Sequence, residues 1–325
     1  MLNISRPRRN RKSAAIRELC QETHLQTSNF IFPLFIIEGK NIKIEVKSMP
    51  GIYRMTLDLI LKEIEECTKL GINSFCLFPA LEDSVKDKNA TESLNTNGLY
   101  LRALREIKKQ FPEICLMTDV AMDPYSSDGH DGYVENGKII NDITLDILAN
   151  MALAQAEAGA DIIGPSDMMD GRVGVIRNHL DDNGFYETSI MSYCAKYASA
   201  FYGPFRDALD SAPKFGDKKT YQMNPANKRE ALIEGNLDEL EGADFLMVKP
   251  ALSYLDVIHV MNENYNLPIA AYNVSGEYAM IKAAAANGWL DEKKAMYESL
   301  LSIKRAGAKI ILTYFAKEMA LELKK

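Results

Sequence analysis

The sequence predicts an α/β fold of the (β/α)8 TIM-barrel class with an N-terminal arm, and three observations favour it. A helical segment, a glycine and a short apolar run recur at 70–79, 158–167, 241–250 and 306–315. Four further apolar runs lie in the gaps, so eight candidate strands alternate with helical segments. The length of 325 residues is ordinary for a single barrel.

Each repeat has the pattern expected where a helix leads into a buried strand. Amphipathic stretches such as TLDLILKEIEECTKL (56–70) carry apolar residues near i, i+3, i+4 and i+7. The glycine that follows suits the position after a helix end, where a positive φ is needed. The apolar run after the glycine then begins the next strand.

The four intervening strands are predicted at FIFPLFII (30–37), ICLMTDV (114–120), TSIMSYCA (188–195) and LPIAAYNV (267–274). They are nearly continuous apolar runs, as expected for parallel strands covered on both faces. An open doubly wound sheet is the alternative, but no GxGxxG motif follows the first strand. We therefore expect an arm over residues 1–28 and one barrel domain over 29–325.

Composition excludes several classes of protein. Hydrophobic residues make up 47%, charged residues 26%, and the net charge is −7, which is unfavourable for binding nucleic acid with the whole surface. We find no apolar run of about 18 residues and expect no membrane span. The N-terminus lacks an apolar signal segment, so we expect a cytoplasmic location. The five scattered cysteines form no CxxC pair, which argues against disulfides and a cysteine zinc site.

Active sites of barrels form at the carboxyl ends of the strands and in the loops that follow them. Two of the predicted strands end in lysine, and the others end near carboxylates and hydroxyls. The side chains expected at this edge are Asp119, Asp123, Ser166, Asp167, Lys196, Lys249, Ser275 and Tyr314.

The two lysines point to imine chemistry. A lysine at the mouth of an apolar barrel is partly desolvated, and a second ammonium nearby repels it. Both effects lower the pKa of Lys249 or Lys196 and leave some neutral amine, which attacks a ketone or aldehyde. The alternative for either residue alone is a structural ion pair with a strand-end carboxylate. Two lysines on neighbouring strands favour Schiff-base chemistry.

Two polar loops extend from this edge. The longer, about residues 202–227, is predicted to be a lid loop, and its Arg206, Lys214, Lys218 and Lys219 suit a substrate carboxylate or phosphate. A mobile basic loop without a ligand is the alternative. The shorter loop, 119–132, contains Asp123, Asp128, His130 and Asp131, a set that suits either a hard cation or a water-filled cleft.

Five segments in register resemble one enzyme family, and the similarity runs over nearly the whole chain. They are MSYCAKYASAFYGPFRDA around Lys196, TYQMNPANKREAL, DFLMVKPALSYLD around Lys249, YNVSGEYAMIKAAA and GAKIILTYFAKE. The family is 5-aminolevulinate dehydratase, whose members condense two 5-aminolevulinate molecules into porphobilinogen in tetrapyrrole (heme and chlorophyll) biosynthesis. The resemblance implies a lyase that releases two waters per product.

The resemblance also implies roles for the two lysines. Lys249 matches the lysine that forms the Schiff base with the ketone on the propionate side of the product. Lys196 matches the second lysine, which forms another imine or transfers protons. We expect Asp119, Ser166 and Tyr202 to contact substrate beside them.

Further matches concern the two substrate carboxylates. Arg206 and Lys218 match a lid pair that grips one of them, with Gln222 close by. Ser275 and Tyr314 match hydroxyls that hold the other.

The metal ligands differ from those of the zinc-dependent members. Ala121, Asp123 and Asp131 stand where those members carry a cysteine triad, so no catalytic zinc is expected. The resemblance is to the aspartate-bearing branch that responds to magnesium or potassium, in which Asp123 and Asp131 orient the substrate amine with or without a monovalent cation. Glu234 matches a carboxylate that holds an allosteric Mg2+ at a subunit boundary. From the sequence alone, Glu234 is a solvated helix residue.

The basic segment RPRRNRK (6–12) matches part of an arm that embraces a neighbouring subunit, and the family often forms octamers built from dimers. Two other interpretations remain open. One is an aldolase or related Schiff-base enzyme on the same barrel, which needs a single lysine. The other is a scaffold or nucleic-acid-binding protein that uses RPRRNRK, which the acidic balance disfavours.

Overall fold

The computed structural model describes residues 4–209 and 213–324, and within them eight parallel strands close into a barrel. The sheet order is β12-β11-β10-β9-β8-β5-β4-β1, and β12 pairs with β1 through Ile311 and Phe30 to close the ring. Every predicted strand is present. The bounds are β1 Phe30–Ile37, β4 Ser74–Pro79, β5 Cys115–Val120, β8 Ile162–Pro165, β9 Ser189–Lys196, β10 Phe245–Lys249, β11 Ile269–Asn273 and β12 Ile310–Thr313.

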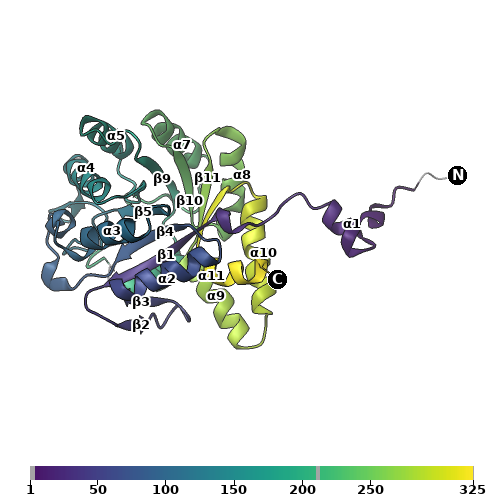
Figure 1. Cartoon of the computed structure of the whole chain (residues 1–325). Coiled ribbons are helices and arrows are strands. Elements are labelled where there is room, and N and C mark those ends of the chain that lie inside the picture. The colour runs from purple at the N-terminus through teal and green to yellow at the C-terminus, as the bar shows by residue number, and fades with distance from the viewer. Residues whose placement is uncertain (1–3, 210–212, 325) are drawn as a thin grey trace.

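Helices surround the barrel and cover its outer face (Figure 1). Their bounds are α2 Leu57–Lys69, α3 Leu99–Gln110, α4 Asn141–Glu157, α5 Arg172–Asp182, α7 Glu230–Leu240, α8 Leu255–Asn264, α9 Ser275–Ala286, α10 Glu292–Arg305 and α11 Ala316–Leu323. The glycines predicted to link helix to strand have positive φ, namely +89° at Gly71, +102° at Gly159 and Gly242, and +121° at Gly307. An L-residue is strained in this conformation, which is why each helix ends there.

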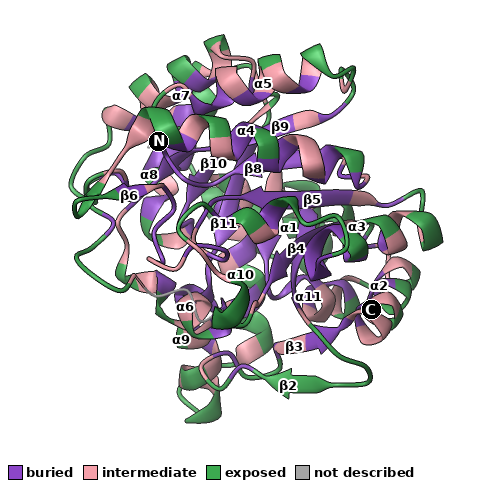
Figure 2. Cartoon of the chain, turned by 90° about the vertical axis from the view of Figure 1, so that its left-hand side faces the viewer, coloured by how far each residue is buried: buried purple, intermediate pink, exposed green. Residues whose placement is uncertain are grey.

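The barrel strands form the core, and exposed residues gather on the outward faces of the helices (Figure 2). On β1, for example, the burial pattern is continuous from Phe30 to Ile36. This continuity confirms that both strand faces are covered, one by the barrel interior and one by helices.

Four short strands lie outside the eight strands of the barrel. The strands β2 (Lys43–Glu45) and β3 (Tyr53–Thr56) form an antiparallel pair, and β3 also pairs with β1. The strands β6 (Val134–Glu135) and β7 (Lys138–Ile139) form a hairpin after the loop that follows β5.

The lid loop begins with a 3-10 turn, Ala200–Tyr202, and a short helix, α6 (Gly203–Leu209). From 213 to 229 it has no helix, and the main chain of Met223 hydrogen-bonds the end of β9 through Met223 N to Lys196 O at 2.9 Å.

The N-terminal segment extends away from the barrel (Figure 1). It contains a 3-10 helix, Pro7–Arg11, and the six-residue helix α1, Ala14–Leu19, and neither has a buried residue. In the described part of the chain, no helix combines the length and apolarity needed to cross a membrane.

Candidate active site

The two predicted lysines meet at the carboxyl edge of the barrel. Lys196 is the last residue of β9 and Lys249 the last residue of β10, and the two are paired in the register of these adjacent strands. Both side chains are buried, each with 6% exposure. A buried lysine is rare unless its surroundings compensate, so the environment of each amine decides its chemistry.

Lys249 lies among aromatic rings. Its Nζ is 4.7 Å from the ring centroid of Tyr272, 5.1 Å from that of Tyr193, 5.2 Å from that of Phe205 and 5.4 Å from that of Tyr202. These rings come from β9, the start of the lid loop and β11, and they form an apolar wall around the amine. Tyr202 also donates a hydrogen bond to the Lys249 carbonyl oxygen at 3.1 Å.

The charge state of Lys249 follows from this burial. Burial, and after it the positive charge of Lys196, lowers the pKa of Lys249 to about 7. Neutral amine is therefore abundant near pH 7, as the strand-end position predicts. Burial also raises the pKa of Asp119 to about 7, against the opposing charge of Lys249. Among the described residues, Asp119 Oδ1 is buried without a hydrogen-bond partner, so this carboxyl is available to take up or release a proton.

Lys196 has a polar environment instead. Its Nζ donates to Asp131 Oδ2 at 3.0 Å and to the carbonyl oxygen of Ser166. Lys196 lies beside Lys249, and its positive charge is the second cause, after burial, of the lowered pKa of Lys249.

Lys218 from the lid loop enters the same cluster. Its Nζ lies 2.5 Å from Asp131 Oδ1 and 3.2 Å from Asp123 Oδ2. Burial would raise the pKa of Asp131, but Lys196 and Lys218 outweigh it and hold that pKa well below its usual range. At Asp123, burial prevails over Lys218 and the pKa is raised. Ion pairs therefore join the end of β9, the loop after β5 and the lid loop, with lysines and aspartates alternating.

The other predicted lid residues differ in burial, and Lys214 and Lys219 are exposed. Gln222 is buried, and its main-chain N–H donates to Lys218 O at 2.9 Å. Arg206 is half-buried on α6, and no carboxylate among the described residues forms an ion pair with it. Residues 210–212 of the predicted lid loop lie outside the described chain.

The two predicted hydroxyls contact residues of the aromatic wall. Ser275 opens α9, and its Oγ accepts a hydrogen bond from the N–H of Phe205 at 2.9 Å. Tyr314 follows β12, and its hydroxyl is 3.0 Å from that of Tyr272. The rings of Tyr272 and Phe205 both face Lys249, so Ser275 and Tyr314 border the same space.

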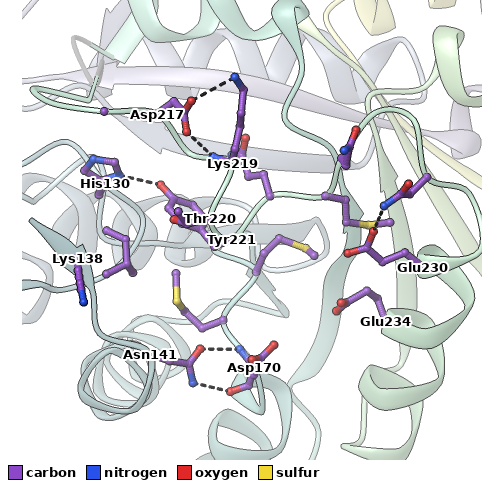
Figure 3. A pocket seen from close by; sticks show the side chains of 18 of the residues that line it. His130, Lys138, Asn141, Asp170, Asp217, Lys219, Thr220, Tyr221, Glu230 and Glu234 are labelled. Atoms are coloured by element: carbon purple, nitrogen blue, oxygen red, sulfur yellow. Dashed lines mark hydrogen bonds and ion pairs between the residues drawn. The ribbon is translucent and has the colours of Figure 1, made fainter.

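Glu234 lies apart from the lysines. It is half-buried on α7 and borders a cavity of about 930 Å³ beneath the lid loop (Figure 3). Burial raises the pKa of Glu234 to about 7; Arg172 lowers it, and nearby carboxylates, first Asp238, raise it further. Glu234 therefore lies away from the two lysines, and the predicted site residue Gln222 borders the same cavity.

The loop after β5 does not form the metal cluster considered from its composition. Within the described chain, no group of three or more His, Cys, Asp or Glu side chains is placed to hold a metal ion. Asp123 and Asp131 face ammonium groups, and His130 bonds to the lid loop.

Sequence reasoning missed part of the site. The aromatic wall of Tyr193, Phe205 and Tyr272 was not predicted, although alternation along β9 and β11 could have placed two of these rings inside the barrel. The bonds of His130 to residues about 90 positions away left no sequence pattern.

These features define a class of enzyme. Adjacent strand-end lysines, one of them poised to be neutral, are the arrangement of a barrel enzyme that forms imines with carbonyl substrates. A family model described as delta-aminolevulinic acid dehydratase matches residues 4–322.

Individual relatives agree with this match. The chain is 58% identical over 318 residues to the chloroplastic delta-aminolevulinic acid dehydratase of Physcomitrium patens, covering 97% of this chain and 73% of the relative. It is 54% identical over 311 residues to that of Chlamydia pneumoniae, covering 96% and 94%.

A solved structure is also similar. The crystal structure of the delta-aminolevulinic acid dehydratase (porphobilinogen synthase) of Toxoplasma gondii ME49, in complex with the reaction product porphobilinogen, has 52% identity and a TM-score of 0.97. The match covers 99% of this chain and 92% of that one. The chain belongs to the delta-aminolevulinic acid dehydratase family.

Proposed function

We infer that this chain is a lyase that condenses two molecules of 5-aminolevulinate into porphobilinogen with the loss of two waters. The observation that carries this inference is the pairing of Lys249 and Lys196 at adjacent strand ends, with the pKa of Lys249 lowered to about 7. The activity agrees with that named for the relatives. It places the chain in tetrapyrrole biosynthesis and sets aside the aldolase and scaffold interpretations.

The first step uses the neutral amine of Lys249. Its nitrogen attacks the ketone carbon of one substrate, and loss of water from the adduct leaves a protonated imine. The imine withdraws electrons from the adjacent carbon, so a base can remove a proton there. Asp119, with its pKa near 7, is the group we propose for this proton transfer.

Lys196 acts on the second substrate. Held by Asp131 and the Ser166 carbonyl, it is placed to donate a proton or, once deprotonated, to form a second imine. The carbon activated by the Lys249 imine then attacks the ketone of the second molecule, and the resulting hydroxyl leaves as the second water. The amine of the second molecule displaces the Lys249 nitrogen from the imine carbon, which closes the ring and frees the lysine. Asp123 and Asp131 orient the substrate amine by charge-assisted hydrogen bonds.

The substrate carboxylates bind at two places. We propose that Arg206, Lys218 and Gln222 hold one of them from the lid loop. An ammonium has three donors, and Lys218 uses two on Asp123 and Asp131, which leaves the third for a substrate oxygen. The hydroxyls of Ser275 and Tyr314 hold the other carboxylate.

Lys249→Ala tests the function. The variant should form porphobilinogen from 5-aminolevulinate at least about 10³-fold more slowly, because no other amine in the described part of the chain has the same apolar environment. Its circular dichroism spectrum should match that of the unchanged chain, since the side chain ends at the barrel mouth. Retained turnover would refute the role of Lys249.

We also propose that Mg2+ binds at Glu234 and regulates the enzyme. Mg2+ keeps several water ligands and uses only one or two carboxylates, so a single half-buried glutamate fits it. A cation would relieve the repulsion between Glu234 and the carboxylates of Asp238 and Asp170. Tyr221 and Gln222 of the lid loop border the same cavity, which gives a bound cation a route to the site.

Glu234→Gln should lose stimulation by magnesium and retain activity without it. Calorimetric titration with Mg2+ should show the loss of one binding site, independent of turnover. Stimulation by magnesium that persists in Glu234→Gln would refute this assignment.

A monovalent cation near Asp123 and Asp131 stays a prediction, tested by comparing activity in potassium and tetramethylammonium salts. Catalytic zinc has no part in the proposal, because Ala121, Asp123 and Asp131 stand at the positions of the three thiolates.

Finally, we propose that the N-terminal arm contacts a neighbouring copy of the chain within an octamer that is built from dimers. A six-residue helix such as α1 is marginal in water without packing. Leu19 of α1 is 85% exposed, and Ile4, which precedes both arm helices, is 60% exposed. A neighbouring subunit that packs against the arm would bury this apolar surface.

A further inference from the structure

His130 connects the loop after β5 to the lid loop. The side chain is buried, with 1% exposure, and both ring nitrogens have partners in the lid loop. Nδ1 lies 3.1 Å from the hydroxyl of Tyr221, and Nε2 lies 3.1 Å from the carbonyl oxygen of Phe215 (Figure 3 shows the Tyr221 contact). The rings of His130 and Phe215 also pack, with centroids 4.6 Å apart.

The partners fix one tautomer of the ring. A carbonyl oxygen only accepts, so Nε2 carries the proton that it donates to Phe215 O. Nδ1 is then an acceptor and receives the hydroxyl proton of Tyr221. Burial raises the pKa of Tyr221 well above its usual value, so this hydroxyl keeps its proton. Its oxygen accepts in turn from the N–H of Asp131 at 3.4 Å. In this series of hydrogen bonds, each donor therefore faces an acceptor.

We propose that His130 is a latch that positions the lid loop for the reaction. Its two attachment points, Phe215 and Tyr221, flank Lys218 in the sequence. Fixing both ends of this short segment directs Lys218 toward Asp123 and Asp131, where its ammonium is found. His130 is therefore a positioning residue that acts through Lys218 and does not touch the reacting atoms. The latch deepens the proposed function and rests on it for its catalytic consequence.

Other contacts near the lid loop do not replace the latch. The N–H of Lys214 donates to Asp128 O at 3.1 Å, and Met223 is bonded to the end of β9. These contacts lie outside the segment 215–221. When His130 is removed, the bond of the Asp131 N–H to Tyr221 and the ion pairs of Lys218 remain, but without the support of the histidine. Loss of the latch should raise the KM for 5-aminolevulinate more than it lowers kcat, because saturating substrate can still draw the lid loop closed.

Limited proteolysis with trypsin tests the latch without relying on activity. Lys214 precedes the segment and Lys219 lies within it, and their side chains are 58% and 74% exposed. Cleavage of a locally opened loop follows the population of the open form. We expect cleavage after these lysines to be about 30-fold faster in both Tyr221→Phe and His130→Leu, because each variant loses two hydrogen bonds. Tyr221→Phe loses the bonds of its hydroxyl to His130 and Asp131, and His130→Leu loses those to Tyr221 and Phe215. Thermal unfolding should stay unchanged.

Two further variants sharpen the result. His130→Gln keeps an N–H donor near the Nε2 position and should restore part of the protection that His130→Leu loses. His259→Gln, at an exposed histidine of α8, is the matched control and should be cleaved like the unchanged chain.

Equal cleavage rates for Tyr221→Phe, His130→Leu and the control would overturn the latch, whether or not the chain makes porphobilinogen. Faster cleavage in a chain that makes none would instead support the latch and refute the proposed function. Should His130→Leu fail to fold, Tyr221→Phe alone decides, because it removes a single hydroxyl.

Discussion

Lys249 illustrates how a side chain acquires its reactivity from its position. The last residue of a buried strand is at once desolvated by the barrel and open to the loops above it. Lys196, one strand away, adds a positive charge that Asp131 and the Ser166 carbonyl keep in place. The two side chains are chemically identical, but Lys249 lies among aromatic rings and Lys196 lies beside a carboxylate.

The pH dependence of kcat/KM should report this difference. The pKa of Lys249 is lowered to about 7, so below pH 7 the amine becomes protonated and cannot attack the ketone. We expect kcat/KM to rise by about tenfold to a hundredfold per pH unit up to pH 6–7 and then to level off, because the amine of Lys249 and the carboxyl of Asp119 must both be deprotonated. A profile that first levels off near pH 10, as for an unperturbed lysine, would contradict the assignment.

Residue-level reasoning from the sequence found both lysines because each closes an apolar run. It could not find the pairing of Lys218 with Asp131, which are 87 residues apart and meet only through the folded lid loop. Nor could it foresee that Lys218 would be buried against carboxylates, since its neighbours in sequence are polar and exposed.

At the scale of elements, the barrel was predictable because its repeat is local. Gly242 and the run from Phe245 to Val248 specify a helix end and a buried strand within a few residues. The loops lack such a repeat. Their contacts depend on residues far away, such as His130 with Phe215, so the structure was needed to place them.

The lid loop contributes Arg206 from α6. Arg206→Ala should reduce kcat/KM by a factor that corresponds to about 1.5–3 kcal/mol, the usual worth of a hydrogen bond to a charged group. Steady-state kinetics with 5-aminolevulinate measure it. Lys219→Ala, an exposed position on the same loop, is the control and should change little. An unchanged kcat/KM in Arg206→Ala would show that Arg206 does not hold a substrate carboxylate.

The helices α5 and α7 are joined by a buried ion pair. The Arg172 Nη atoms lie 2.9 and 3.0 Å from the two Asp238 oxygens, and one of them also reaches Ser192 on β9 at 3.0 Å. Asp238→Ala should lower the free energy of unfolding by about 3–5 kcal/mol, because it leaves a buried guanidinium without its main partner. Denaturant unfolding measures this loss. A change below about 1 kcal/mol would show that Asp167 or water compensates.

For the whole molecule, charge is distributed unevenly. The chain has a net charge of −7, yet residues 6–12 contain five basic side chains. The sequence identified this arm, and the structure shows it extended without burial of its own helices. Attraction between a basic arm and an acidic neighbour is screened by salt, so we expect the assembly to weaken at high ionic strength.

Deleting residues 1–24 should therefore reduce the size of the assembly. Sedimentation velocity of the full-length and shortened chains at equal concentration measures it. We expect the full-length chain to sediment as an octamer and the shortened chain as smaller species. Equal sedimentation coefficients would show that the arm does not hold neighbouring copies together.

The most direct test of the account traps the imine itself. The protein is incubated with 5-aminolevulinate, reduced with borohydride, digested and mapped by mass spectrometry. We expect a reduced adduct on the peptide that contains Lys249, and we expect this adduct to be absent in Lys249→Ala. An adduct confined to surface lysines, or none under conditions of turnover, would contradict the central claim that Lys249 is the nucleophile.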